Sequence, residues 1–246
     1  MSNENIKQAV NLIMNSNKIF ALTGAGISTE SGIPDFRSTD GYYSKMDPML
    51  ALSKDTLLNN PKRFYKEGYV ILEDLNNKEP NRGHFVLKEL ENMGYLSGII
   101  TQNIDNLHTK AGSKNVYEVH GHTRGVHCLE CCKNYNFEFM KSQVETGKIP
   151  PRCECGGILR PDVILFGDMM PDTFVKASNE LYTTDLLIVI GSSLTVSPVN
   201  YLPKYVKNLI IINNSSTPYD NVANFIFNDN ASDVLESILE ELKSRI

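Results

Sequence analysis

Residues 20–38 read FALTGAGISTESGIPDFRS, an apolar strand followed by a glycine-rich turn and then by a carboxylate, an aromatic ring and a guanidinium. Gly24 and Gly26 are free to take positive φ and carry no Cβ, so the backbone can approach a pyrophosphate closely. Arg37 has a planar fork of donors that suits phosphate oxygens. For Gly-Ala-Gly alone, a simple turn after a buried strand is the more economical interpretation. The continuation to Arg37 is too long for a strand exit and favours a site for a phosphate-bearing cofactor.

Short apolar runs elsewhere in the chain predict further strands of one sheet. The runs occupy residues 19–22, 96–101, 186–190, 209–212 and 225–227. They are continuous rather than alternating, which indicates a sheet covered on both faces, as in a parallel α/β fold. Functional loops of a Rossmann-like fold follow the carboxyl ends of its strands. The residues expected there are Gly24, Gln102, Gly191 and Asn213.

Two helices are predicted at the ends of the chain. Ile6, Val10 and Ile13 recur at helical spacing before the first strand. A second stripe predicts a helix that closes the sheet, with Ser232 or Asp233 as its N-cap. This stripe consists of Leu235, Ile238, Leu239 and Leu242.

Composition limits the classes of partner. The 246 residues include 24 Lys and Arg against 29 Asp and Glu, and no run of basic residues marks a nucleic-acid or anionic-membrane face. We therefore expect no direct nucleic-acid binding and no membrane association. The first five residues lack a basic and an apolar signal region, and no stretch is long enough to span a bilayer, so we expect a cytoplasmic protein.

All five cysteines lie between residues 128 and 155, which is unlike a secreted disulfide framework. The spacing of two pairs is close to that of a zinc ribbon, and it predicts one structural Zn²⁺. The expected ligands are Cys128, Cys131, Cys153 and Cys155. Cys132 is a spare thiol that could replace a neighbour, and a set of buried free thiols is the alternative. A closed set of four thiolates leaves no position for substrate, so the metal would not take part in chemistry.

Further motifs follow in a fixed order: TQNIDNLH at 101–108, VHG at 119–121, the cysteines, FGD at 166–168 and GSSLTVSP at 191–198. Together with residues 20–38, they resemble the motifs of the sirtuins, of bacterial type, over about residues 20 to 235. Sirtuins are NAD-dependent protein lysine deacylases. The second cysteine pair departs from the family pattern, because one residue separates its members instead of the commoner two.

The resemblance implies a single catalytic unit over residues 1–246 with a Rossmann-like parallel sheet and an inserted small domain. The Rossmann-like part would comprise residues 1–37, 85–123 and 161–246. The small domain would combine a helical insertion, 38–84, with the zinc ribbon, 124–160. Substrate and cofactor would occupy the cleft between the two parts.

The resemblance also assigns roles to three residues. His120 would deprotonate a ribose hydroxyl, so that the acyl group is transferred from lysine to ADP-ribose and nicotinamide is released. Asn103 would hold the ribose or a water, and Asp105 the nicotinamide carboxamide, although Asp105 is also plausible as a helix N-cap. The same comparison gives a set of cofactor-binding residues: Gly24, Ala25, Gly26, Asp35, Phe36, Arg37, Gln102, Asn103, Ile104, Asp105, Gly191, Ser192, Ser193, Asn213, Asn214 and Ala231.

Acyl-lysine proteins or peptides are the partners that the resemblance implies. Two extended segments, 163–166 and 196–198, would clamp the peptide as an added strand. The substrate residues expected are Val163, Phe166, Gly167 and Val196.

Gly68 and Ile71 stand where sirtuins that prefer succinyl-lysine carry a Tyr-x-x-Arg pair, so neutral acyl groups are expected, and the missing tyrosine would leave room for longer chains. A shift of one position in this alignment would put Tyr69 near the pocket.

Two other functions remain open at this point. An ADP-ribosyltransferase would use the same NAD cleft but pass ADP-ribose to a protein nucleophile. A non-catalytic module that binds NAD and zinc would tolerate the loss of His120. An oxidoreductase is disfavoured, because Gly-Ala-Gly lacks the third glycine of the dinucleotide fingerprint.

Overall fold

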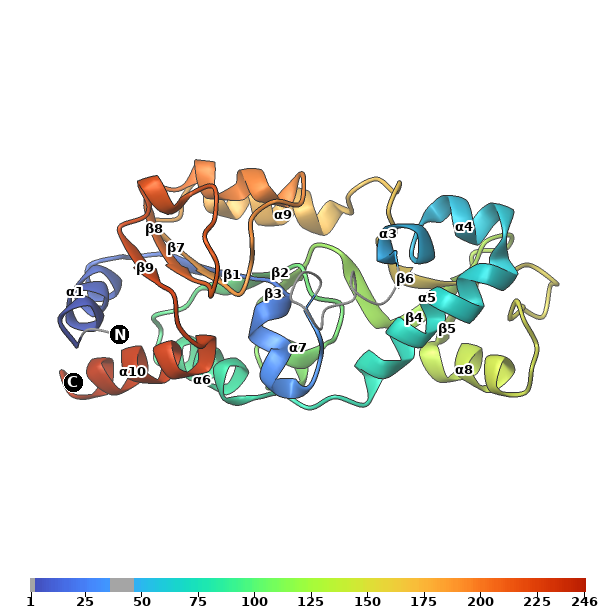
Figure 1. Cartoon of the computed structure of the whole chain (residues 1–246), viewed down its shortest axis with the longest axis horizontal. Coiled ribbons are helices and arrows are strands. Elements are labelled where there is room, and N and C mark those ends of the chain that lie inside the picture. The colour runs from blue at the N-terminus through green and yellow to red at the C-terminus, as the bar shows by residue number, and fades with distance from the viewer. Residues whose placement is uncertain (1–2, 36–46) are drawn as a thin grey trace.

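Six parallel strands form the larger of two sheets in the computed structural model, which describes residues 3–35 and 47–246 (Figure 1). The strands are β1 (Ile19–Thr23), β2 (Gly98–Thr101), β3 (Val116–Glu118), β7 (Leu186–Ile190), β8 (Asn208–Ile212) and β9 (Phe225–Phe227). Their order across the sheet is β3-β2-β1-β7-β8-β9. The order reverses between β1 and β7, and this is where doubly wound sheets bind ligands.

Both faces of this sheet are covered, as the continuous apolar runs predict. In β7, Leu186, Ile188 and Ile190 pack on one side with α1 (Asn3–Met14), α6 (Arg82–Asn92) and α10 (Ala231–Lys243). The intervening Leu187 and Val189 pack on the other side with α9 (Asp172–Leu181) and η2 (Val199–Tyr205). Figure 1 shows α9 above the sheet and α6 and α10 below it. The predicted α/β class with a parallel sheet is therefore confirmed.

A smaller antiparallel sheet with the order β5-β4-β6 lies at the other end of the molecule (Figure 1). Its strands are β4 (Gly121–Cys128), β5 (Asn134–Asn136) and β6 (Leu159–Val163). The helices around it are α3 (Pro48–Ala51), α4 (Lys54–Asn59), α5 (Pro61–Asn76) and α8 (Phe137–Glu145). Phe64, Tyr65 and Leu72 of α5 form its core with Leu159 and Met140. We call this part the small domain.

The proposed domain boundaries do not follow the small sheet closely. β4 begins at Gly121 and β6 ends at Val163, so each strand crosses a boundary that the sequence analysis set at 123/124 or 160/161. Short helical elements complete the described chain: η1 (Ala25–Ser31), α7 (Leu107–Lys110) and η3 (Asp220–Val222).

The C-terminal helix begins earlier than its predicted cap. Asn230 is the N-cap of α10, and its Oδ1 accepts hydrogen bonds from the N–H groups of Ser232 and Asp233 at 2.8 and 3.2 Å. The prediction of Ser232 or Asp233 was wrong, because Ser232 is 1% exposed and instead uses its Oγ to accept from the N–H of Gly83 at 3.2 Å. This contact joins α10 to α6.

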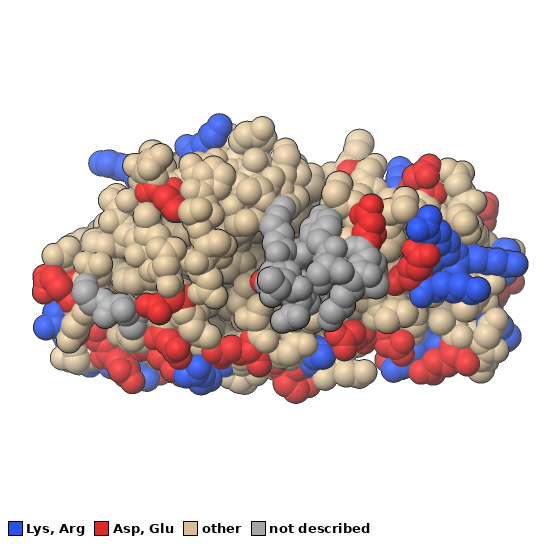
Figure 2. All heavy atoms as spheres, viewed as in Figure 1, with Lys and Arg blue, Asp and Glu red and all other residues tan. Residues whose placement is uncertain are grey.

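Charged side chains of both signs are interspersed along the lower edge of the molecule in Figure 2, and a basic group lies at the small-domain end. The upper part of the larger domain shows few charges in the same view. None of the helices within residues 3–35 and 47–246 is both long and apolar enough to cross a membrane.

Candidate active site

A cavity of about 440 Å³ opens where β1, β2, β7 and β8 end, and the small domain forms its other wall. Its size is typical of a small-molecule site. The structure places in its lining all but two of the catalytic, cofactor-binding and substrate residues that the sequence analysis named: Gly24, Ala25, Gly26, Asp35, Gln102, Asn103, Ile104, Asp105, His120, Val163, Phe166, Gly167, Gly191, Ser192, Ser193, Val196, Asn213, Asn214 and Ala231. The other two, Phe36 and Arg37, lie outside the described residues.

Three glycines bring two strand-end loops together at the centre of the sheet edge. A Cβ on Gly24 would lie 2.7 Å from the carbonyl oxygen of Gly191, and one on Gly26 would lie 2.6 Å from the Cα of Gly191. Gly24 has a φ of −123°, and only Gly191 of the three has a positive φ, 61°. Gly24 and Gly26 therefore do not use the positive φ that a glycine is free to take. They lack a Cβ because the loop after β7 packs directly on the loop after β1.

His120 follows β3 and has one ring nitrogen fixed by the backbone. Its Nδ1 lies 2.9 Å from the carbonyl oxygen of Gln102. A carbonyl oxygen can only accept, so Nδ1 carries the proton and the neutral ring keeps its lone pair on Nε2. Burial lowers the pKa of His120 below 6.5, and the bond to Gln102 only partly offsets this effect. The imidazole is thus neutral at physiological pH and is able to accept a proton.

Ser28 connects the two other residues expected to act in chemistry, and the sequence analysis did not name it. Its Oγ donates to Oδ2 of Asp105 at 2.7 Å and accepts from Nδ2 of Asn103 at 3.1 Å. The side chain is fully buried and lines the cavity. The available signal was its position inside the quoted glycine-rich stretch, two residues after Gly26.

Asp105 both contacts the start of a helix and lines the cavity. Its Oδ1 accepts from the N–H of Leu107 at 3.0 Å, which supports the first turn of α7, and the residue also lines the cavity. Asp105 is 3% exposed, and burial raises the pKa of its carboxyl, although hydrogen bonds from Leu107 and Ser28 oppose the shift. A group of this kind gains from a polar ligand that would hydrogen-bond to it.

Gln102, which follows β2, links the end of this strand to the ends of β1 and β7. Its Nε2 donates to Oγ of Ser192 at 2.8 Å, and its N–H donates to the carbonyl of Thr23 at 3.0 Å. The loops after β1, β2 and β7 are therefore held by direct hydrogen bonds.

The end of the cavity next to the small domain is apolar. Its lining there includes Ile33, Leu52, Ile71, Leu75 and Ile104. Among the described lining residues, none is a lysine or an arginine.

The structure corrects one expectation about α5 and places Tyr69, which a shifted alignment would bring near the pocket, elsewhere. The space beside Gly68 is filled, since a Cβ there would lie 2.5 Å from the carbonyl oxygen of Ala51, so the glycine leaves no room for a longer acyl chain. Tyr69 does not line the cavity; its ring stacks on Phe137 with centroids 6.0 Å apart. Ile71 of the same helix does line it.

Part of the expected peptide edge is already paired within the protein. The N–H of Phe166 donates to the carbonyl of Leu52 at 3.0 Å, and its carbonyl accepts from the N–H of Lys54 at 2.9 Å. The main chain of Phe166 is therefore not free to clamp a peptide, although the residue is 37% exposed and lines the cavity. The N–H of Ile164 donates to the carbonyl of His120 at 2.8 Å, which joins this edge to the histidine.

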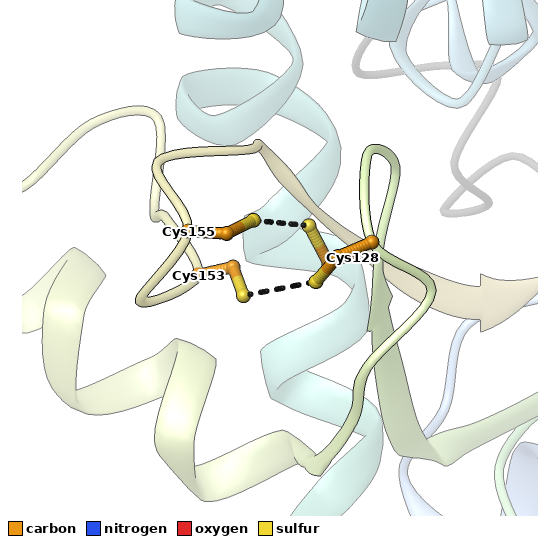
Figure 3. Close-up of side chains that lie close together, drawn as sticks. Cys128, Cys153 and Cys155 are labelled. Atoms are coloured by element: carbon orange, nitrogen blue, oxygen red, sulfur yellow. Dashed lines mark hydrogen bonds between the residues drawn. The ribbon is translucent and has the colours of Figure 1, made fainter.

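The four predicted cysteines converge from two loops of the small domain (Figure 3). The Sγ atoms of Cys128 and Cys155 are 3.5 Å apart, those of Cys131 and Cys153 are 3.6 Å apart, and all four lie within 4.8 Å of one another. A tetrahedral zinc with bonds of about 2.3 Å requires sulfur atoms about 3.8 Å apart, so the donor set fits one Zn²⁺. Cys132 is exposed and is not in this group.

Two other histidines have structural contacts away from the cavity. His84 lies in the first turn of α6, where its Nδ1 is 3.0 Å from Oδ1 of Asn81. His108 places Nε2 2.9 Å from Oγ1 of Thr23. Their rings are 4.8 Å apart and both residues are buried.

A sequence model described as the Sir2 family matches residues 24–198. The chain is 53% identical to the "NAD-dependent protein deacetylase 2" of Caldanaerobacter subterraneus subsp. tengcongensis, over 99% of each chain. It is 46% identical to the "NAD-dependent protein deacetylase" of Saccharolobus solfataricus, over 95% of this chain and 96% of that protein.

The structure is also similar to solved Sir2 structures. One, described as Sir2 with a deacetylated p53 peptide and 3'-O-acetyl ADP ribose, superposes with a TM-score of 0.92 at 34% identity over 96% of this chain and 98% of that one. The family match covers the three glycines of the cavity, His120 and the four clustered cysteines. The sequence similarity extends over almost the whole chain. The chain therefore belongs to the Sir2 family, the sirtuins.

Proposed function

We propose that this protein is an NAD-dependent protein lysine deacylase that removes acetyl or other neutral acyl groups and releases nicotinamide and O-acyl-ADP-ribose. The observation that carries the proposal is His120, a neutral base with a free Nε2. It lies in one cavity with Gly24, Gly26 and Gly191. The names of the relatives, NAD-dependent protein deacetylases, support it.

The residues present fit NAD. Gly24, Gly26 and Gly191 line the cavity at the centre of the sheet edge, where their missing Cβ atoms let the loops after β1 and β7 meet. Their N–H groups are bonded to carbonyls within the protein. The hydroxyls of Ser192 and Ser193 lie beside them in the cavity wall. Asn213, Asn214 and Ala231, farther along the same edge, would then bind the adenosine end. When bound, NAD supplies the nicotinamide leaving group and the ADP-ribose that receives the acyl group.

The base in this scheme is His120. The carbonyl of Gln102 holds its Nδ1–H, so Nε2 accepts the proton of the hydroxyl that attacks the acyl group. Burial keeps the ring neutral and ready to accept. We infer that the bond from the N–H of Ile164 to the carbonyl of His120 keeps the base next to the substrate edge.

Ser28 orients the two polar side chains that would meet the nicotinamide ribose end. It fixes the carboxylate of Asp105 through Oδ2 and the amide of Asn103 through Nδ2. Asp105 would accept from the carboxamide, and Asn103 would hold the ribose or a water. Both side chains are set by protein contacts before substrate arrives, which reduces the reorganisation needed on binding.

The acyl-lysine would enter from the apolar end of the cavity. Similar solved structures contain Sir2 bound to acetylated and to propionylated peptides. Ile33, Ile71 and Ile104 suit an aliphatic acyl chain, and no described lining residue supplies a cation for an acyl carboxylate. An unpaired buried carboxylate costs several kcal/mol, so the pocket would disfavour succinyl groups. Val163, Gly167 and Val196 would contact the peptide.

The zinc ion would be structural, held by Cys128, Cys131, Cys153 and Cys155 on the side of the small sheet. The division into a Rossmann-like part and a small domain, with substrate and NAD in the cleft between them, also remains our proposal. The cavity wall supports it, because Ile71 and Leu52 come from the helical insertion and Gly191 from the larger sheet.

The test is to incubate the protein with NAD and matched acetyl-lysine and succinyl-lysine peptides, and to identify peptide and nucleotide products by mass spectrometry. We expect deacetylation with O-acetyl-ADP-ribose, and a smaller kcat/KM for the succinyl peptide. His120→Ala should reduce the rate by about 10²- to 10⁴-fold, whereas His122→Ala, outside the cavity lining, should retain it. ADP-ribose attached to protein without deacylation would instead indicate a transferase.

A further inference from the structure

A carboxylate beside the cavity is almost entirely buried, and the proposed chemistry does not use it. Asp168 lines the cavity, yet its side chain is only 8% exposed. Its Oδ2 accepts a hydrogen bond from the N–H of Leu165 at 2.8 Å and forms an ion pair with Nη2 of Arg160, whose side chain is 14% exposed. Buried carboxylates require such partners. These contacts therefore fix Asp168 in one position.

The same two residues fix a tight turn of the chain. The N–H of Asp168 donates to the carbonyl of Leu165 at 2.9 Å, and Gly167, in the third position of this turn, has a φ of 91°. A glycine with positive φ at that position is typical of a type II turn. Arg160 also donates from Nη2 to the carbonyl of Val163 at 3.3 Å. One guanidinium thus holds both ends of residues 163–168.

Protein contacts occupy the neighbours of this turn but leave Gly167 open. The N–H of Ile164 is bonded to His120, and both main-chain groups of Phe166 are bonded to the segment at Leu52 and Lys54. The N–H and carbonyl of Gly167 bond to no described residue, and Gly167 lines the cavity. The turn therefore presents one free main-chain donor and acceptor at the cavity wall.

We propose that Asp168 and Arg160 are positioning residues for the acyl-lysine peptide: their ion pair holds the 165–168 turn so that the free main-chain groups of Gly167 meet an extended substrate. The inference rests on the proposed deacylase function. Strand addition gains affinity from main-chain hydrogen bonds, and a preset edge avoids the ordering cost on binding. Neither side chain touches the reacting atoms.

The experiment measures two ligands separately. A fluorescent acetyl-lysine peptide is titrated by anisotropy, and ADP-ribose by calorimetry, for the wild type, Asp168→Asn, Arg160→Met and the double variant. Loss of one charged hydrogen-bond pair should weaken peptide binding by about 10-fold, with the Kd for ADP-ribose unchanged. Because both side chains serve one ion pair, the double variant should bind the peptide no more weakly than the weaker single variant.

Lys54→Met is the matched control. Nζ of Lys54 lies 3.9 Å from Oδ1 of Asp168, but its side chain is 49% exposed, so its removal should change little. If a variant were merely partly unfolded, fewer molecules would bind either ligand. The folded fraction would still bind the peptide and ADP-ribose with the wild-type Kd values. If the wild type binds the peptide and both single variants bind it with the same Kd, the inference about Asp168 and Arg160 is wrong, while the proposed function stands. No peptide binding by the wild type would overturn the proposed function with it.

Discussion

The chemistry of His120 depends on one main-chain contact, because the carbonyl of Gln102 decides which ring nitrogen carries the proton. The sequence motif identified the histidine, but it did not reveal the tautomer. That property comes from the position of β2, whose end brings the carbonyl of Gln102 to Nδ1 of His120.

The pH dependence of turnover should follow the lowered pKa of His120. The base acts only when it is neutral, and burial holds its pKa below 6.5. Activity should therefore be constant at neutral pH and fall as the pH decreases through a value below 6.5. The measurement is kcat/KM for an acetyl-lysine peptide between about pH 5 and pH 8. Thermal melts at each pH separate loss of the base from loss of the fold, and a decline that begins above neutrality would contradict the assignment.

The residues of the site were predictable to different extents. Gly24 and Gly26 were found from the motif, but their packing against Gly191 was not, because this contact joins residues far apart in the sequence. Ser28 was missed because a serine in a loop carries no sign of its burial until Asn103 and Asp105 are placed beside it.

At the scale of elements, the strands were predicted well because buried parallel strands have continuous apolar sequences. β3 was not among the predicted runs: Val116–Glu118 is short, edge-placed and only partly buried. The small domain could not be built from sequence alone, since its sheet joins β4 to β6 across the cysteine region and its core depends on α5.

A substitution of Gly68 should change the stability of the protein rather than its preference among acyl groups. Gly68→Ala places a Cβ 2.5 Å from the Ala51 carbonyl and 3.0 Å from Cδ2 of Leu52, and backbone cannot yield easily. Overpacking of this kind costs about 1–3 kcal/mol, measured as the free energy of unfolding by denaturant titration. Val70→Ala is the control on the same helix, because Val70 is 55% exposed. Equal effects of the two substitutions would show that α5 does not pack on α3 as described.

The zinc affinity of the cysteine site should depend on the hydroxyl of Tyr135 as well as on the four thiolates. The hydroxyl of Tyr135 lies 3.0 Å from Sγ of Cys153, and in a metal-bound site the thiolate can only accept. Outer partners of metal ligands typically contribute about 10- to 100-fold in affinity, so Tyr135→Phe should release zinc faster to a chromogenic chelator. Tyr182→Phe, an exposed position, is the control.

Complete removal of the metal should lower the melting temperature of the protein, because much of the folding energy of a small ribbon comes from metal binding. Turnover should then fall indirectly. If chelation removed the zinc while melting temperature and turnover both stayed unchanged, the structural assignment would be wrong.

At the scale of the whole molecule, a buried pair of histidines should set the acid limit of stability. Burial lowers the pKa of His84 to about 4, and burial together with the neighbouring His84 lowers the pKa of His108 well below 6.5. The unfolded chain binds protons near pH 6.5, so stability is complete above that pH and is lost as the pH falls towards 4. For His84 alone the loss is about 3 kcal/mol.

Denaturant titrations at several pH values test this expectation. The free energy of unfolding of the wild type should fall between pH 6.5 and pH 4, and His84→Gln should fall less over the same range. His127→Gln is the control, because His127 lies at the surface of the small sheet beside Asp162. An identical decline in His84→Gln and the wild type would exclude the buried pair as the cause.

The chain passes from the larger sheet to the small domain at His120, because β3 ends at Glu118 and β4 begins at Gly121. It returns at Ile164, whose N–H is bonded to the carbonyl of His120. His120, the proposed general base, thus stands at the junction between the larger sheet and the small domain. Points on a rotation axis move least, so a cleft that opens to admit NAD and peptide would swing its walls apart while leaving the imidazole almost stationary.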